Sequence, residues 1–114
     1  MSPITTHVLD TAIGRPAVGL DVTLDLLEAD GHFTRLAERF TNEQGRVNDF
    51  IAAGALQAGR TYRLTFDTGP YFAASDRPMF YPYVKVIFTV LDAREHYHVP
   101  LILSPFGYST YRGT

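Results

Sequence analysis

Apolar and polar positions alternate in short segments along the whole chain, which predicts β-strands. In residues 61–67, Tyr62, Leu64 and Phe66 alternate with Arg63 and Thr65, the pattern of a half-buried strand. Similar segments are separated by Gly, Asp, Asn and Pro, a spacing typical of a β-sandwich. The expected strands are residues 5–10, 20–29, 33–40, 46–49, 61–67, 83–91, 96–103 and 106–112.

The residues between these segments predict the turns. Asp30-Gly31 between two strand segments is a strong hairpin signal. Residues 14–16 and 42–45 are also expected to turn, and two alanines between prolines predict a short helix at residues 71–75. Because no repeat, linker or low-complexity segment interrupts the pattern, residues 1–114 are interpreted as a single all-β domain.

Composition narrows the classes of function. The chain has 114 residues, a net charge of −2 and no cysteine. Without a cluster of basic residues we expect no nucleic-acid partner, and without cysteine there is neither disulfide nor thiolate chemistry. No apolar run approaches the roughly 20 residues of a membrane span, so we expect no membrane partner and a cytoplasmic location. Lys85 is the one lysine among ten basic residues, which fits either planar anions or the base composition of the genome.

Strand alternation also assigns polar side chains to the outward faces. The apolar set of residues 96–103 is Tyr97, Val99, Leu101 and Leu103. His96 and His98 are therefore expected to point outward. In the first strand Val8 belongs to the core, so His7 points outward as well.

The outward faces are expected to form one polar surface containing His7, His98, Arg46 and Arg112. A single histidine on a strand is more often merely solvated, which is the interpretation adopted for His32 beside the hairpin glycine. Three histidines on two strands could also hold a catalytic zinc. However, two arginines would repel a dication and no carboxylate stands among these residues to orient the imidazoles. We therefore expect neither a metal nor another cofactor.

Five segments resemble, in order and spacing, the transthyretin-related 5-hydroxyisourate hydrolases. They are Thr6-His7-Val8-Leu9-Asp10, Gly14-Arg15-Pro16-Ala17, Gly45-Arg46, His96-Tyr97-His98-Val99-Pro100-Leu101 and Tyr108-Ser109-Thr110-Tyr111-Arg112-Gly113-Thr114. Together they extend over the whole chain. This family usually ends in Tyr-Arg-Gly-Ser, so Thr114 is a departure that keeps the hydroxyl and adds a methyl.

The resemblance implies a transthyretin-like sandwich of two four-stranded sheets with one short helix, assembled as a homotetramer, a dimer of dimers with sites between the dimers. It implies hydrolysis of a small-molecule substrate, 5-hydroxyisourate, to 2-oxo-4-hydroxy-4-carboxy-5-ureidoimidazoline in urate and purine catabolism. The implied catalytic residues are His7, Arg46, His98 and Thr114. The implied substrate-binding residues are Arg46, Tyr111, Arg112 and Gly113.

Elementary chemistry agrees with this hydrolase hypothesis. Opening a cyclic amide requires a base for the water, donors for the oxyanion and a grip on a flat anionic ring, and His and Arg supply all three. A histidine beside Arg46 or Arg112 should stay neutral near pH 7, because the guanidinium disfavours a second positive charge. The alternative is a transthyretin-like carrier or binding module for a small aromatic ligand. The sequence leaves open which histidine is the base.

Overall fold

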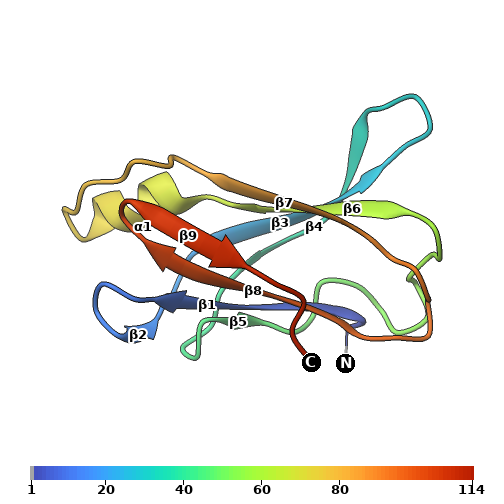
Figure 1. Cartoon of the computed structure of the whole chain (residues 1–114), viewed down its shortest axis with the longest axis horizontal. Coiled ribbons are helices and arrows are strands. Elements are labelled where there is room, and N and C mark those ends of the chain that lie inside the picture. The colour runs from blue at the N-terminus through green and yellow to red at the C-terminus, as the bar shows by residue number, and fades with distance from the viewer. Residues whose placement is uncertain (1) are drawn as a thin grey trace.

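A computed structural model describes residues 2–114 as two stacked β-sheets with one short helix (Figure 1). The elements are β1 (Ile4–Asp10), β2 (Arg15–Pro16), β3 (Asp21–Leu27), β4 (Phe33–Phe40), β5 (Arg46–Val47), β6 (Thr61–Phe66), α1 (Thr68–Ala74), β7 (Val84–Thr89), β8 (Tyr97–Ser104) and β9 (Gly107–Thr110). One sheet has the order β4-β3-β6-β7, and the other has the order β2-β1-β8-β9 with β5 also paired to β1. The expected all-β sandwich with a short helix is confirmed.

The observed elements differ from the predicted ones in three main respects. β2, interpreted from the sequence as part of a turn, pairs with β1, so one sheet has five strands instead of four. The helix begins at Thr68, before the expected residue 71, because Pro70 is tolerated in the first turn, where a backbone N–H would lack an intrahelical partner. β9 ends at Thr110 instead of residue 112, and pairing resumes only as an isolated bridge between His98 and Gly113.

The core lies between the two sheets and follows the predicted alternation. β6 buries Tyr62, Leu64 and Phe66 from one sheet, each at most 1% exposed. β8 buries its own apolar set from the other sheet: Tyr97, Val99, Leu101 and Leu103. Since these side chains use the inward faces, the polar residues between them are left on the outer face of β8.

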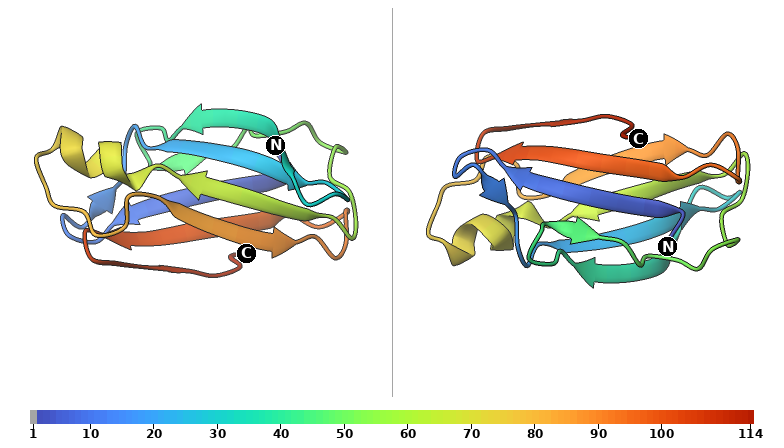
Figure 2. Two further views of the ribbon diagram at one scale, coloured as in Figure 1. Left: turned by 90° about the horizontal axis from the view of Figure 1, so that it is seen from above. Right: turned by 90° about the horizontal axis from the view of Figure 1, so that it is seen from below.

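β7 and β9 are the outer strands on the same side of the sandwich (Figure 2). Their outer edges lack a strand partner among residues 2–114, and apolar side chains are exposed along them. Ile87 of β7 is 58% exposed, and Tyr111 just beyond β9 is also 58% exposed. Unpaired strand edges offer backbone groups to another chain, so this side of the sandwich is suited to self-association.

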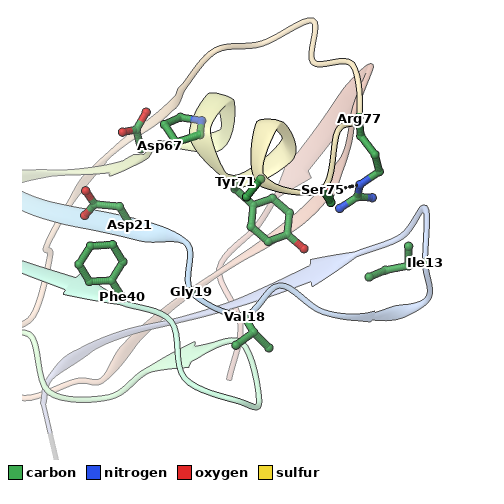
Figure 3. A pocket seen from close by; sticks show the side chains of 11 residues that line it. Ile13, Val18, Gly19, Asp21, Phe40, Asp67, Tyr71, Ser75 and Arg77 are labelled. Carbon is green, nitrogen blue, oxygen red and sulfur yellow. Dashed lines mark hydrogen bonds between the residues drawn. The ribbon is translucent and has the colours of Figure 1, made fainter.

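A cavity of about 430 Å³ lies at the end of the sandwich that carries α1 (Figure 3). Two residues that line it donate hydrogen bonds to the buried carboxylate of Asp10, Tyr71 Oη at 2.7 Å and Arg77 Nη2 at 2.6 Å, and the Tyr71 bond fastens α1 to the end of β1. Burial raises the pKa of Asp21 at this cavity to about 6, and the neighbouring carboxylates of Glu38 and Asp67 add to the shift. The predicted histidines do not line this cavity.

Candidate active site

The register of β1 with its two neighbours brings the predicted site residues together on the outer face of the five-stranded sheet. His7 lies opposite Arg46 of β5 in an antiparallel pair. Two residues earlier, Thr5 lies opposite His98 of β8 in a parallel pair. Residues opposite one another in neighbouring strands share a face of the sheet. The structure therefore gathers His7, Arg46 and His98, as the sequence predicted.

Arg46 is held beside His7 by a tight turn that requires glycine. Gly45 has a φ of +74°, and a Cβ at this position would lie 2.5 Å from the carbonyl oxygen of Val8. That close approach lets the Val8 N–H donate to the Gly45 carbonyl at 2.8 Å. The Asn42 side chain also accepts a hydrogen bond from the Arg46 N–H at 2.9 Å. A substituted residue at position 45 would push Arg46 away from the sheet.

The surroundings of both histidines of this surface lower their pKa values, which favours the neutral rings. Burial lowers the pKa of His7, the Arg46 guanidinium lowers it further, and a hydrogen bond to the backbone of Gln44 partly opposes these effects. Burial also lowers the pKa of His98, and the electrostatic effects of Arg46, His96 and His7 lower it further. Arg46 shifts both pKa values in the direction expected from the sequence, although burial has the larger effect on each ring. A neutral imidazole can accept a proton, so either ring can serve as a general base near pH 7.

The chain end lies directly against His98. The Gly113 N–H donates to the His98 carbonyl at 2.8 Å. A Cβ at Gly113 would lie 2.7 Å from Cδ2 of the His98 ring and 3.2 Å from Cγ of Pro100, so this contact also depends on glycine. Thr114 follows immediately and is exposed, which places its hydroxyl one residue from the ring contact.

Arg112 and Tyr111 are not brought together with His7 and Arg46 within one protomer. The Arg112 guanidinium lies 4.3 Å from the centroid of the Tyr97 ring and forms an ion pair with Glu95 at 3.5 Å. Arg112 and Tyr111 instead line a cavity of about 190 Å³ among apolar side chains of β7 and β8. Alternation had placed Arg112 on the outer face, but β9 ends at Thr110 and the alternation ends with it. Their substrate-binding role stays a prediction.

Thr5 is a residue of this surface that the sequence analysis missed. It is 2% exposed, and its Oγ1 lies 2.8 Å from Nδ1 of His98 and 2.9 Å from Nε2 of His96. The available signal was its position two residues before His7, which puts the two side chains on one face of β1. His96 therefore joins the cluster through Thr5.

Within residues 2–114, no three His, Asp or Glu side chains are arranged so that they could hold a metal ion. In the same part of the chain, no helix combines the length and apolar character needed to cross a membrane. The cluster itself offers imidazoles, a guanidinium and hydroxyls. These groups suit proton transfer and the binding of carbonyl oxygens or anions.

Comparison with known proteins gives consistent matches over nearly the whole chain. Residues 4–113 match the model of the HIUase/Transthyretin family. The 5-hydroxyisourate hydrolase 2 of Rhizobium meliloti (strain 1021) is 49% identical over 116 residues, covering 97% of this chain and 95% of that protein. The 5-hydroxyisourate hydrolase of Mus musculus is 46% identical over 114 residues, covering 99% and 96%.

Solved structures with this fold include both a hydrolase and a transthyretin in complex with thyroxine. Sea bream transthyretin in complex with thyroxine superposes with a TM-score of 0.92 at 28% identity, covering 99% of this chain and 96% of that chain. Klebsiella pneumoniae 5-hydroxyisourate hydrolase superposes with a TM-score of 0.85 at 36% identity, covering all of both chains. Because the backbone resembles both, the side chains of the site must separate the two functions.

Proposed function

The chain belongs to the HIUase/Transthyretin family, and we infer that it is a 5-hydroxyisourate hydrolase of urate catabolism. Its product is 2-oxo-4-hydroxy-4-carboxy-5-ureidoimidazoline. The observation that carries this inference is the pair of histidines with lowered pKa values beside Arg46 on one face of the sheet. The hydrolase names of relatives at 46% and 49% identity support it.

The reaction needs one proton acceptor and one stabiliser of negative charge. A neutral histidine takes a proton from water as the water oxygen bonds to the amide carbonyl carbon. The resulting oxyanion then reforms the carbonyl, the ring C–N bond breaks, and the imidazolium returns its proton to the leaving nitrogen. A positioned base of this kind typically contributes about 10²–10⁴-fold to the rate.

Arg46 is proposed to bind the substrate and its developing oxyanion. The substrate is a flat ring bearing carbonyl oxygens and ring nitrogens, which matches the planar fork of a guanidinium. Arg46 lies opposite His7 in the sheet and acts electrostatically on both His7 and His98. The same guanidinium can therefore keep the base neutral and hold the substrate next to it.

The homotetramer and the tail's role are further parts of this proposal. The unpaired edges of β7 and β9 and their exposed apolar side chains favour association of protomers. Gly113 packs on the His98 ring, which supports a role for Thr114 at the site. The cytoplasmic location expected from the sequence stays a prediction.

Arg46→Lys is expected to lower kcat/KM by about 10²-fold although the positive charge is retained. A lysine is a point charge that cannot donate two parallel hydrogen bonds, and losing one oxyanion donor costs about 10²–10³-fold in studied enzymes. Steady-state rates of 5-hydroxyisourate loss measure the effect. Arg35→Lys is the matched control, because Arg35 is an exposed arginine on β4 of the other sheet, where it pairs with Asp25. An Arg46→Lys enzyme with parental kcat/KM would show that charge alone is required.

The hydrolase and carrier hypotheses are separated by one assay. The protein is mixed with 5-hydroxyisourate freshly generated by oxidation of urate, and the absorbance of this intermediate is followed. A hydrolase removes the intermediate with multiple turnovers and faster than its spontaneous decay. A carrier leaves the decay rate unchanged and binds a small aromatic ligand stoichiometrically.

A further inference from the structure

One buried hydroxyl connects two histidines of the site. Thr5 Oγ1 lies 2.8 Å from Nδ1 of His98 and 2.9 Å from Nε2 of His96. The two rings are nearly parallel, with an interplanar angle of 24° and centroids 6.3 Å apart. His98 is half-buried while His96 is exposed to solvent. The three side chains thus form a continuous path from the site to the surface.

The single hydroxyl proton couples the tautomers of the two rings. A threonine hydroxyl donates one hydrogen bond, and a neutral imidazole carries its proton on one nitrogen only. Thr5 can therefore donate to only one of the two rings, so at least one ring must donate to Thr5 for both contacts to be hydrogen bonds. In one direction Nδ1–H of His98 donates to Thr5, and Thr5 donates to Nε2 of His96. In the other direction Nε2–H of His96 donates to Thr5, and Thr5 donates to Nδ1 of His98.

The first direction is the one that serves a base. With its proton on Nδ1, His98 has a bare Nε2, the ring nitrogen that Thr5 does not contact. In the opposite direction Nε2 carries the proton and cannot accept another. The direction of the Thr5 hydrogen bonds consequently decides whether His98 can deprotonate water.

We propose, on the basis of the proposed hydrolase function, that Thr5 is a positioning residue that holds His98 in the tautomer with a basic Nε2, and that His96 is the outlet for the proton. Water gives a proton to Nε2 of His98. The Nδ1 proton of His98 then passes to Thr5 Oγ1 as the Thr5 hydroxyl proton passes to Nε2 of His96. His96 finally releases its Nδ1 proton to solvent, which leaves His98 neutral with its proton on Nε2. When the leaving nitrogen takes that Nε2 proton, the transfers run in reverse: a solvent proton enters at Nδ1 of His96, the Nε2 proton of His96 returns to Thr5, and the Thr5 hydroxyl proton returns to Nδ1 of His98.

The surroundings of His98 favour this movement. Burial, Arg46, His96 and His7 all disfavour a positive charge on His98. His96 is exposed, so water can hydrate the charge there. The relay moves the positive charge away from Arg46 and leaves a neutral His98 whose Nε2–H can be donated to the leaving nitrogen.

The tautomer is measured directly, without reference to activity. Long-range ¹H–¹⁵N spectra of protein labelled at the histidine rings distinguish Nδ1–H from Nε2–H. In the parent protein near pH 7.5, we expect His98 to carry its proton on Nδ1. Thr5→Val, which keeps the shape and removes the hydroxyl, should give a mixture of His98 tautomers, and Thr5→Ser should restore the parental state. A parent spectrum with Nε2–H, or a Thr5→Val spectrum identical to the parent, would overturn the proposal.

Kinetics test the same residues separately. Thr5→Val should lower kcat about tenfold with little change in KM, a fraction of the ~10²–10⁴ that a positioned base supplies, and Thr5→Ser should recover it. Thr6→Val is the matched control, because Thr6 is equally buried on the same strand but its hydroxyl donates to the Val99 carbonyl. A loss of kcat in Thr6→Val as large as in Thr5→Val would show that the effect is general packing and would overturn the proposal.

The outlet is tested at the exposed end of the path. His96→Ala should lower kcat in dilute buffer, and added imidazole should restore it, because a diffusible base can reach the surface position. Full activity of His96→Ala in dilute buffer would remove His96 from the relay. If the parent protein does not hydrolyse 5-hydroxyisourate at all, the proposed function fails, whereas the spectra still decide whether Thr5 sets the His98 tautomer.

Discussion

Replacing His98 with asparagine is expected to lower kcat for 5-hydroxyisourate by about 10²–10⁴-fold, the range that a positioned general base contributes. The same change at His7 should also lower turnover strongly, since both rings have lowered pKa values and lie close enough to Arg46 to be affected by its charge. Initial rates are measured after subtraction of spontaneous decay. Both histidines lie on the outer face of the sheet, so thermal unfolding of either variant should resemble that of the parent.

His32→Asn provides the matched control for these variants. His32 is an exposed histidine that pairs with Asp30 at the β3–β4 hairpin, far along the chain from the cluster. It should keep parental kcat. The double variant at positions 7 and 98 should lose much less than the product of the two single losses, because groups that act in one step are not additive. Full activity in either single variant would remove that residue from the site.

Deleting residues 112–114 is expected to abolish measurable hydrolysis. Gly113 packs against the His98 ring, and Thr114 is the next residue, whose hydroxyl is proposed to act at the site. The deletion also removes the ion pair between Arg112 and Glu95, so the activity of the truncated protein is compared with that of the parent after sedimentation has established its assembly. Thr114→Ser should be nearly neutral, whereas Thr114→Val keeps the shape, loses the hydroxyl and should be impaired.

The tail variants separate a structural role from a catalytic one. A truncated protein that dissociates, together with a fully active Thr114→Val enzyme, would assign the tail to assembly alone. A truncated protein that keeps its assembly and the parental rate would contradict any role for the chain end at the site. Loss of rate without loss of assembly is the expected result.

The alternation of apolar and polar residues was sufficient to predict much of the fold and the outward direction of the His7 and His98 side chains. It indicated that Tyr97 and Val99 enter the core, so His98 had to face outward, and the structure agrees. It could not show that Arg46 lies opposite His7 or that Thr5 lies opposite His98, because these registers join distant segments and one of the pairs is parallel. Alternation placed these histidines and Arg46 on one expected polar surface, and the resemblance to a known family gave them catalytic roles, but the register that brings them together is visible only in the structure.

The features that were missed have local physical reasons. β2 contains two residues, too few for any alternation to be visible. Arg112 lies beyond the end of β9, where side chains no longer alternate between the two faces of a sheet. Its guanidinium packs on the Tyr97 ring. Thr5 looks like an ordinary strand threonine until the parallel pairing with β8 places its hydroxyl between two imidazoles.

The similarity to both transthyretin and a 5-hydroxyisourate hydrolase shows why side chains matter more than backbone here. The TM-score is higher for the thyroxine complex, at 0.92, than for the Klebsiella hydrolase, at 0.85, whereas sequence identity is higher for the hydrolase. A shared sandwich is therefore compatible with either function. The basic, proton-accepting surface formed by His7, Arg46 and His98 favours hydrolysis.

The pH dependence of kcat/KM for 5-hydroxyisourate, recorded with a chelator present throughout, tests the central claim of a metal-free neutral histidine base most directly. Because the pKa values of His7 and His98 are lowered in the folded protein, the base stays neutral at pH 7 and is protonated only below the ordinary histidine value of about 6.5. We expect full activity near neutrality and an acid limb with its midpoint below 6.5. Activity that vanishes with chelator and returns with zinc, or an acid limb centred above 6.5, would contradict this mechanism.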